Sequence, residues 1–442
     1  MIFFNRKVFL NDNRIAFNTL AQLASRFLVV LISLFTTSLL TRHLGVEGYG
    51  NYVFVTSFIL LFVSFSDLGT STIGVRESSQ NPSKTKETFG QVLFLRLIFT
   101  STLLLLIYLL SRVLPQFVDL RQATIIASLV LPFLVLRTLS QAIFQVNLRL
   151  DLSSLLEISA SVVFFTLSFW YFWTKGKNLE QIMLIWVISA FLSGLLGLVL
   201  SRKYTRISLC FDKQKLFRLF KESLPLGMSL LVYTVYDRGI DNFILKTYFS
   251  SQEIGYYGLA YKIHGNLILG AAFLLNSLFP LLCSKKASLD VFKNLFHKAF
   301  SFLFIAGALI LVVGFFSSPF IIKTIAGSQF EPSVLALRIL LLATFFSYLN
   351  HLTGYSLVAL GKQAVLFRAS LVGLSINLVL NLVFIPRFSF LAACVATIMT
   401  EATLFFLTYH FLRKKYNFFY NKRDLLLDVR SLFKDKQKYF ES

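Results

Sequence analysis

Long apolar stretches follow one another along almost the whole chain, and only short polar segments separate them. An α-helix needs about 20 apolar residues to cross the hydrocarbon core of a bilayer, where its backbone must hydrogen-bond within the helix. The pattern therefore predicts an all-α integral membrane protein with twelve transmembrane helices. They are expected near 15–40, 49–67, 90–111, 123–143, 152–173 and 181–201, then near 223–245, 255–283, 299–322, 333–355, 364–386 and 390–412.

Composition supports a membrane protein. Hydrophobic residues make up 56% of the 442 residues and charged residues only 14%, whereas a soluble domain is about 25% charged. The first span is too long for a cleaved signal peptide and carries Arg26 in its middle. The chain is therefore expected to keep this helix in the membrane.

Lysine and arginine are distributed unevenly between the loops. With the N-terminus in the cytoplasm, most of them fall in inner segments, above all the arm before the first helix, the loop after the sixth and the C-terminal tail. Both termini are therefore expected to be cytoplasmic. The net charge of +22 lies mostly on this inner rim, where it contacts anionic lipid, so nucleic-acid binding is rejected. The three cysteines suggest no disulfide framework, and the five histidines have no metal-ligand spacing. No metal or cofactor is expected.

The two halves of the sequence resemble each other. Glu-Gly-Tyr-Gly at 47–50 follows the first helix, and Gly-Tyr-Tyr-Gly at 255–258 follows the seventh. Asp-Lys-Gln-Lys occurs after the sixth helix at 212–215 and again after the twelfth at 435–438. Because six is an even number of spans, the pattern predicts two parallel six-helix repeats. The expected parts are an N-terminal lobe at 1–204, an amphipathic cytoplasmic linker at 205–222, a C-terminal lobe at 223–416 and a basic tail at 417–442.

Polar side chains recur at helical spacing inside the apolar spans. Asn18, Gln22 and Arg26 follow one another at intervals of four residues and share one face of the first helix. Lys262 and Asn266 share a face of the eighth helix in the same way. A charge at the bilayer centre costs about 2.5–3.5 kcal/mol on insertion scales, so it needs a partner or a water-filled cavity. We expect these five residues to line a hydrophilic cavity between the lobes.

The seventh helix carries Asp237, Arg238 and Asp241. Arg238 is expected to add positive charge to the cavity. The two aspartates are either titratable groups for ion coupling or structural partners of Arg238, and both interpretations stay open. Glu401 in the twelfth helix and Asp67 at the inner mouth of the second are further candidates for coupling or gating, although Asp67 is also placed to cap a turn.

Other polar residues within the spans have simpler interpretations. Asn377 and Asn381 either join neighbouring helices or serve function. Glu157 lies nearer the inner interface and is less attractive for coupling. Four arginines near span ends are expected to anchor their helices by reaching the membrane surface, namely Arg96, Arg137, Arg149 and Arg338.

A series of short motifs carries a family resemblance. They are Thr-Arg-His-Leu-Gly at 41–45, Glu-Gly-Tyr-Gly-Asn-Tyr at 47–52, Ser-Asp-Leu-Gly at 66–69, Arg-Glu at 76–77, Ala-Tyr-Lys at 260–262 and Leu-Gly-Lys at 360–362, with Asn377, Asn381, Pro386 and Glu401 in the last two helices. In this order they resemble the Wzx-type O-antigen flippases of the polysaccharide transport family, within the multidrug/oligosaccharidyl-lipid/polysaccharide (MOP) exporter superfamily. The resemblance extends over nearly the whole chain.

The resemblance implies that the protein moves an undecaprenyl-pyrophosphate-linked oligosaccharide from the inner to the outer leaflet of a bacterial cytoplasmic membrane. Such proteins alternate between inward-open and outward-open states, often with coupling to an ion gradient, and the polymerase and chain-length machinery are plausible partners by analogy. Arg26 and Lys262, supported by Arg238, are expected to bind the pyrophosphate.

Other functions remain in competition. A MATE-type drug or cation antiporter shares the architecture, but basic residues deep in both lobes disfavour a cationic drug. A lipid II-type flippase usually has fourteen helices. A polytopic polymerase, ligase or glycosyltransferase would usually present a large outer loop with catalytic groups, and no such loop is expected here. The protein is therefore expected not to be an enzyme.

Overall fold

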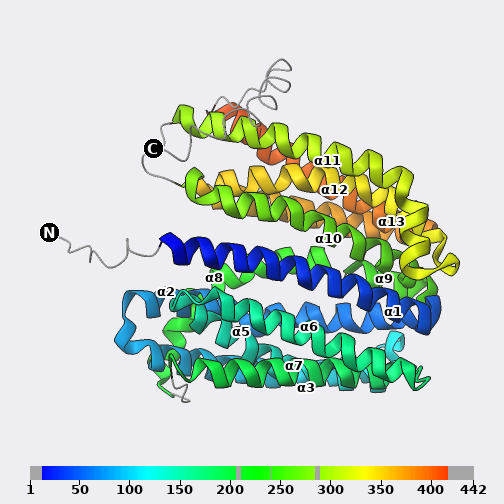
Figure 1. The fold of residues 1–442 in the computed structure, drawn as a ribbon, viewed down its shortest axis with the longest axis horizontal. Helices are drawn as coiled ribbons and strands as arrows, with labels where there is room; N and C mark the ends of the chain where they lie inside the picture. Colours follow the sequence, from blue (N-terminus) through cyan, green and yellow to red (C-terminus); the bar gives the residue numbers. More distant parts are fainter. Residues whose placement is uncertain (1–11, 206–210, 239, 284–288, 417–442) are drawn as a thin grey trace. The chain divides into compact units, whose positions relative to one another are not determined.

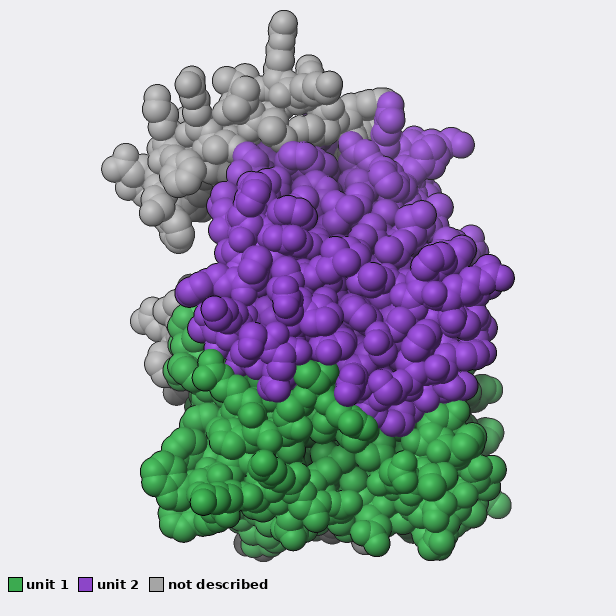
Figure 2. All heavy atoms as spheres, turned by 90° about the vertical axis from the view of Figure 1, so that its right-hand side faces the viewer, with its two compact units in different colours: residues 1–239 green, residues 240–442 purple. Residues whose placement is uncertain are grey.

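The computed structural model describes residues 12–205, 211–238, 240–283 and 289–416, which are helical almost throughout (Figure 1). The chain forms two compact units, Met1–Gly239 and Ile240–Ser442 (Figure 2). The lobes predicted from the sequence at 1–204 and 223–416, with a linker at 205–222, stay a prediction.

Unit 1 contains eight α-helices in its described residues. They are α1 (Asp12–Asp67), α2 (Thr70–Gln80), α3 (Thr85–Val113), α4 (Arg121–Ser128), α5 (Val130–Val146), α6 (Leu150–Trp173), α7 (Leu179–Ser201) and α8 (Lys213–Arg238). Helix α1 is two helices joined at Gly45, whose φ of 68° is readily available only to glycine. The tight junction replaces the loop that would otherwise separate two apolar stretches.

Unit 2 contains five α-helices in its described residues. They are α9 (Ile240–Tyr248), α10 (Ser251–Leu282), α11 (Leu289–Ala326), α12 (Pro332–Ala359) and α13 (Gln363–Tyr416). Helix α13 also consists of two helices, which meet at Ser389 with a φ of 53°. Helix α12 packs against α10, α11 and α13 and forms the middle of this unit.

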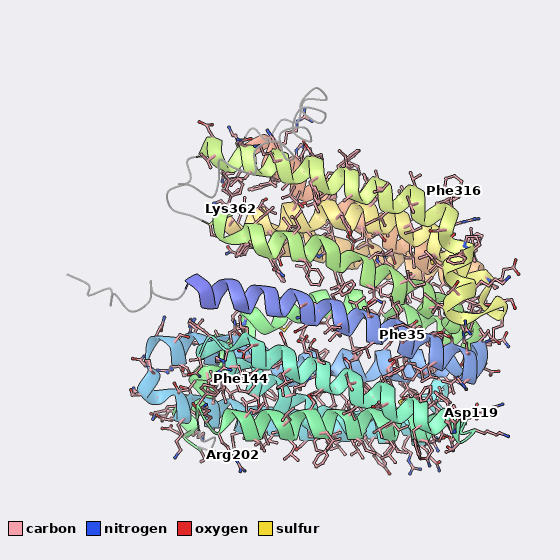
Figure 3. All side chains as sticks on the ribbon, viewed as in Figure 1. Phe35, Asp119, Phe144, Arg202, Phe316 and Lys362 are labelled. Atoms are coloured by element: carbon pink, nitrogen blue, oxygen red, sulfur yellow. The ribbon has the colours of Figure 1, made fainter. Side chains whose placement is uncertain are left out.

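Among the described residues, nine helical stretches are long and apolar enough to cross a membrane. The bundles carry large apolar side chains on their surfaces, as a lipid environment requires: Trp173 is 76% exposed and Phe316 is 77% exposed. Figure 3 shows Phe316 projecting outward from α11. Together with the apolar composition, these surfaces establish a multi-pass α-helical membrane protein.

Small residues and aromatic rings fill the contacts between helices. Ser189, Ser193, Gly197 and Ser201 repeat every four residues on α7, and all are buried. Such a stripe allows close helix approach in lipid, and the Ser193 hydroxyl donates a hydrogen bond of 2.9 Å to the Leu156 carbonyl of α6. Unit 2 packs instead around rings such as Phe300, which stacks with neighbouring aromatic side chains.

Candidate functional site

Arg26 faces a carboxylate on a neighbouring helix of unit 1. Its Nη2 lies 3.6 Å from Oε1 of Glu157 on α6, and the two side chains are 51% and 29% exposed. The Gln141 amide of α5 donates to the same oxygen at 3.3 Å and lies 3.5 Å from the Ser153 carbonyl. Side chains from α1, α5 and α6 therefore meet at Glu157. The sequence places this residue nearer the inner interface, and it was expected to be a weaker candidate for ion coupling.

Arg137 lies one turn before Gln141 on α5. The side chain is partly buried, it interacts electrostatically with Glu157, and its Nε atom is buried with no hydrogen-bond partner in the described part of the chain. The sequence suggested an anchor at the membrane surface. In the sequence, Arg137 and Gln141 are four residues apart, and this spacing indicates that they share one face of α5. In the structure, this face is turned toward α6.

Arg96 was also predicted to reach the membrane surface, and this prediction is wrong. The side chain is 0% exposed and pairs with Asp67 at the end of α1. Its Nε donates to the Thr70 hydroxyl at 2.9 Å, and Nη1 donates to the Thr138 hydroxyl at 3.1 Å. Asp67 Oδ1 also accepts from the backbone N–H of Ser71 at 3.0 Å. The pair closes the junction between α1 and α2, which favours a structural role for Asp67.

In unit 2, Asp241 belongs to a buried polar cluster. The aspartate is 7% exposed, and its Oδ2 accepts a hydrogen bond of 2.7 Å from the Tyr257 hydroxyl. Asn381 donates to Oδ1 of Asp241 and, at 3.0 Å, to Oδ1 of Asn377. The Oδ1 atom of Asn381 is itself buried without a hydrogen-bond partner among the described residues. This cluster gathers several oxygen atoms of the kind that bind a proton or a hard cation.

The remaining described candidates of unit 2 lie elsewhere on its helices. Glu401 is 8% exposed, and Oε2 accepts a 2.6 Å hydrogen bond from the Asn350 amide, which joins α13 to α12. Lys262 is exposed on α10. Asn266, one turn further on, has a buried Nδ2 atom without a partner among the described residues.

Four candidates cannot be placed in this way. The side chains of Asn18, Gln22, Asp237 and Arg238 lie outside the described residues. Within the described ranges, no group of three or more His, Cys, Asp or Glu side chains gathers as a metal site would require.

The first turns of α8 are tied to α2 and α3 by ion pairs within unit 1. The pairs are Arg76 with Glu222, Arg218 with Glu77 at 3.2 Å, and Lys215 with Glu87. The hydrogen bond from Lys215 to Glu87 raises the pKa of the lysine, and the backbone N–H of Lys215 lowers the pKa of Asp212. We call these pairs the α8 latch.

Comparison with known proteins identifies a matching family and a shared fold. A family model described as polysaccharide biosynthesis protein matches residues 15–285. The capsular polysaccharide biosynthesis protein CapF of Staphylococcus aureus is 24% identical over 380 residues, which cover 83% of this chain and 91% of CapF.

Solved structures resemble the fold of the chain over nearly its full length. The lipid II flippase MurJ in an inward closed conformation matches with a TM-score of 0.79 and 16% identity, and the match covers 95% of this chain and 91% of MurJ. An inward-facing multidrug resistance MATE transporter of the MOP superfamily matches with a TM-score of 0.72 and 13% identity over 90% of this chain and 98% of the transporter. The fold is therefore shared with these transporters.

Proposed function

The chain belongs to the polysaccharide biosynthesis protein family, and from this membership we propose that it is a flippase for lipid-linked oligosaccharide. The family match carries the proposal, and the sequence resemblance to polysaccharide exporters of the MOP superfamily is thereby confirmed. The cargo is an undecaprenyl-pyrophosphate-linked O-antigen or similar repeat unit. It moves from the inner to the outer leaflet of a bacterial cytoplasmic membrane by alternating access, without catalysis.

We infer twelve transmembrane helices in two parallel repeats. The nine candidate stretches include α1 and α13, each of which contains two helices joined at a kink. Counting each of these as two spans gives eleven, and the remaining span is proposed from the apolar stretch of the sequence near 223–245. An even number of spans places both termini on one side, and the distribution of lysine and arginine favours the cytoplasm.

Arg26 in unit 1 and Lys262 in unit 2 are each proposed to supply positive charge to the substrate. A sugar with a pyrophosphate is large, hydrated and anionic, so it needs polar surroundings with fixed cations. Arg26 and Lys262 are both exposed side chains in the middle of long apolar helices, which suits contact with such a head group. Arg238, Asn18, Gln22 and Asn266 are proposed to complete the polar lining.

Coupling to an ion gradient is proposed at Asp241. The Asp241 carboxylate, the Tyr257 hydroxyl and the Oδ1 atoms of Asn377 and Asn381 bring several oxygen atoms close together, which suits a proton or a small cation. Asp237 and Glu401 remain secondary candidates. The MurJ and MATE folds keep a lipid II-type flippase and a drug or cation antiporter as alternatives. A polysaccharide polymerase or ligase is less favoured.

The proposal is tested by complementation in a bacterial strain that lacks its own O-antigen flippase. The wild-type chain, Arg26→Ala and Lys262→Ala are compared at matched expression, with Arg368→Ala as a control, since Arg368 is an exposed arginine of α13. Surface polysaccharide is expected with the wild type and the control, and loss is expected in the two cavity variants, because the pyrophosphate then loses a cationic partner.

The possible outcomes distinguish an error in the proposed cargo from an error in the proposed binding residues. Rescue by all four proteins would keep the flippase and reject the two cationic positions. If wild type fails while undecaprenyl-linked units accumulate inside the cell, the same comparison is repeated with capsular and lipid II cargo. Failure with every lipid-linked cargo would overturn the proposed function.

A further inference from the structure

Arg137 is a cation whose surroundings in unit 1 are incomplete. Its side chain is partly buried on α5, and its Nε atom is buried with no hydrogen-bond partner among the described residues. Leaving a buried polar atom unpaired is unfavourable, and buried polar atoms in proteins are nearly always paired. An arginine in this position therefore calls for an acceptor.

Glu157 is the charged group that interacts with Arg137, and its carboxylate already contacts Gln141 and Arg26. Glu157 Oε1 accepts from Gln141 at 3.3 Å and lies 3.6 Å from Arg26 Nη2. A separation of 3.6 Å exceeds the usual hydrogen-bond length, so the Arg26 contact is a loose ion pair. Two guanidinium groups therefore face one carboxylate, and the group keeps one positive charge in excess.

We propose that Arg26 and Arg137 form a binding site for a phosphate ester, in which Glu157 is the resident counter-ion that the phosphate replaces. This inference rests on the proposed function and extends it, because it identifies a second arginine and an internal competitor for the anion. Guanidinium groups bind phosphate oxygens through paired N–H donors, and two of them on different helices suit a diphosphate.

The arrangement also explains how the anion enters and leaves. Arg26 is half-exposed and only loosely paired, so it turns from Glu157 to an incoming phosphate without breaking a short hydrogen bond. Glu157 keeps the hydrogen bond from Gln141 when Arg26 moves away. When the phosphate leaves, Glu157 takes back the arginine, so neither state leaves Arg26 without a counter-ion. Such competition favours release as well as binding.

Binding is measured directly on purified full-length protein in nanodiscs of neutral lipid, with fluorescent farnesyl diphosphate as the probe. Inorganic pyrophosphate and phosphatidylglycerol serve as competitors, because cargo and ordinary phospholipid both carry phosphate. Displacement by pyrophosphate but not by phosphatidylglycerol assigns the site to a diphosphate. Displacement by phosphatidylglycerol assigns it to the phospholipid head group.

Four variants test the individual roles. Arg137→Ala is expected to weaken binding about tenfold or more, and Arg137→Lys less, since charge remains without the paired donors. Glu157→Gln is expected to bind several-fold more tightly, because the competitor has lost its charge. Arg112→Ala is the matched control: this arginine is exposed at the C-terminal end of α3 and lies over the Tyr108 ring. It is expected to bind like the wild type.

Glu157→Gln keeps the inference falsifiable if Arg137→Ala fails to fold. A merely structural Glu157 would give equal or weaker binding when neutralised, and that result would overturn the site, as would unchanged binding by a folded Arg137→Ala. The assay needs no transport. Wild type that exports polysaccharide while these variants bind normally would reject the site and keep the function, and tight Arg137-dependent binding without export would reject the function alone.

Discussion

At the scale of single residues, two aspartates in apolar helices have different surroundings. Asp67 pairs with Arg96, whose side chain is 0% exposed, and also accepts a hydrogen bond from the backbone N–H of Ser71. Asp241 receives hydrogen bonds from Tyr257 and Asn381, which are neutral. The buried arginine beside Asp67 favours a permanent negative charge there, whereas Tyr257 and Asn381 add no positive charge beside Asp241. An aspartate within an apolar helix therefore has a structural role at Asp67 and a proposed coupling role at Asp241.

The same substitution at both positions separates these roles. Asp67→Asn leaves Arg96 buried without its counter-ion and is expected to destabilise the folded protein by about 3 kcal/mol, the low end for broken buried ion pairs, because Asp67 itself is 29% exposed. Asp241→Asn keeps the shape of the side chain and is expected to fold normally. It should lose transport driven by an ion gradient, because the titratable group is gone. Thermal unfolding in detergent and transport into vesicles measure the two effects.

Equal melting temperatures for Asp67→Asn and the wild type would contradict the structural role. Gradient-driven transport by Asp241→Asn would move coupling to another carboxylate, with Glu401 the next to test.

The residue pattern predicts which helix faces are polar, but not which partner each face meets. Arg137 and Gln141 share a face of α5 because they are four residues apart, and helix geometry alone determines this. The pairing of Arg26 with Glu157 depends on how α6 is rotated against α1, which sequence periodicity does not specify. Arg96 is buried because the break after α1 brings Asp67 beside it, and this is a tertiary effect.

At the scale of elements, α8 shows how packing decides where a segment belongs. The sequence suggests a linker that lies on the membrane surface, and Phe217 is indeed 68% exposed. Yet Leu216 and Leu219 are buried in the core of unit 1. Gly227 lies so close to α1 that an added Cβ would be 2.5 Å from the Leu68 carbonyl oxygen. Close backbone packing and the α8 latch together explain why α8 clusters with unit 1.

These two contributions to the docking of α8 differ in size. The exposed ion pairs of the α8 latch contribute little because water and salt screen them, whereas a Cβ at Gly227 forces the helix backbone to shift. Gly227→Ala is therefore expected to increase amide hydrogen exchange in the first half of α8 more than Glu222→Gln does. Raising the salt concentration should reproduce the small effect of Glu222→Gln, because salt screens exposed charges.

The stability of the α8 latch also depends on pH. The raised pKa of Lys215 means that its stabilising contribution to the latch is lost only as pH rises through that value. Asp212, which lies 3.4 Å from Lys215 but is not part of the latch, has a lowered pKa, so its contribution is lost only as pH falls through that pKa. Exchange in α8 is therefore expected to be constant near neutral pH. A larger effect of Glu222→Gln than of Gly227→Ala would show that charge dominates.

At the scale of the whole molecule, hydropathy correctly predicts an all-helical membrane protein because lipid allows few alternatives to a helix. Ten of the twelve expected spans fall within helices of the described residues or their immediate ends, including the two that meet at Gly45 and the two that meet at Ser389. The span expected near 123–143 is divided between α4 and α5, and the one near 223–245 includes a residue outside the described ranges. The assignment of α8 to unit 1 depends on how this helix docks, and hydropathy carries no information about which neighbour an apolar helix packs against.

The parallel repeat makes a further prediction about the two faces of the membrane. In unit 1, Figure 3 places Arg202 and Asp119 toward opposite ends of the helices. In a variant without Cys210, Cys283 and Cys394, Asp119→Cys is expected to react with a membrane-impermeant maleimide added outside the cell. Arg202→Cys should react only after the membrane is opened, because lysine and arginine are retained on the cytoplasmic side.

Unit 2 supplies the decisive comparison. Parallel repeats require Lys323→Cys, at the end of α11, to react from outside, and Lys362→Cys, between α12 and α13, to react only from inside. The reverse pattern in unit 2 with the expected pattern in unit 1 would mean inverted repeats and an odd number of spans in one half. Parallel orientation matters for mechanism, because two lobes related by an axis along the membrane normal open to either side by the same rocking motion.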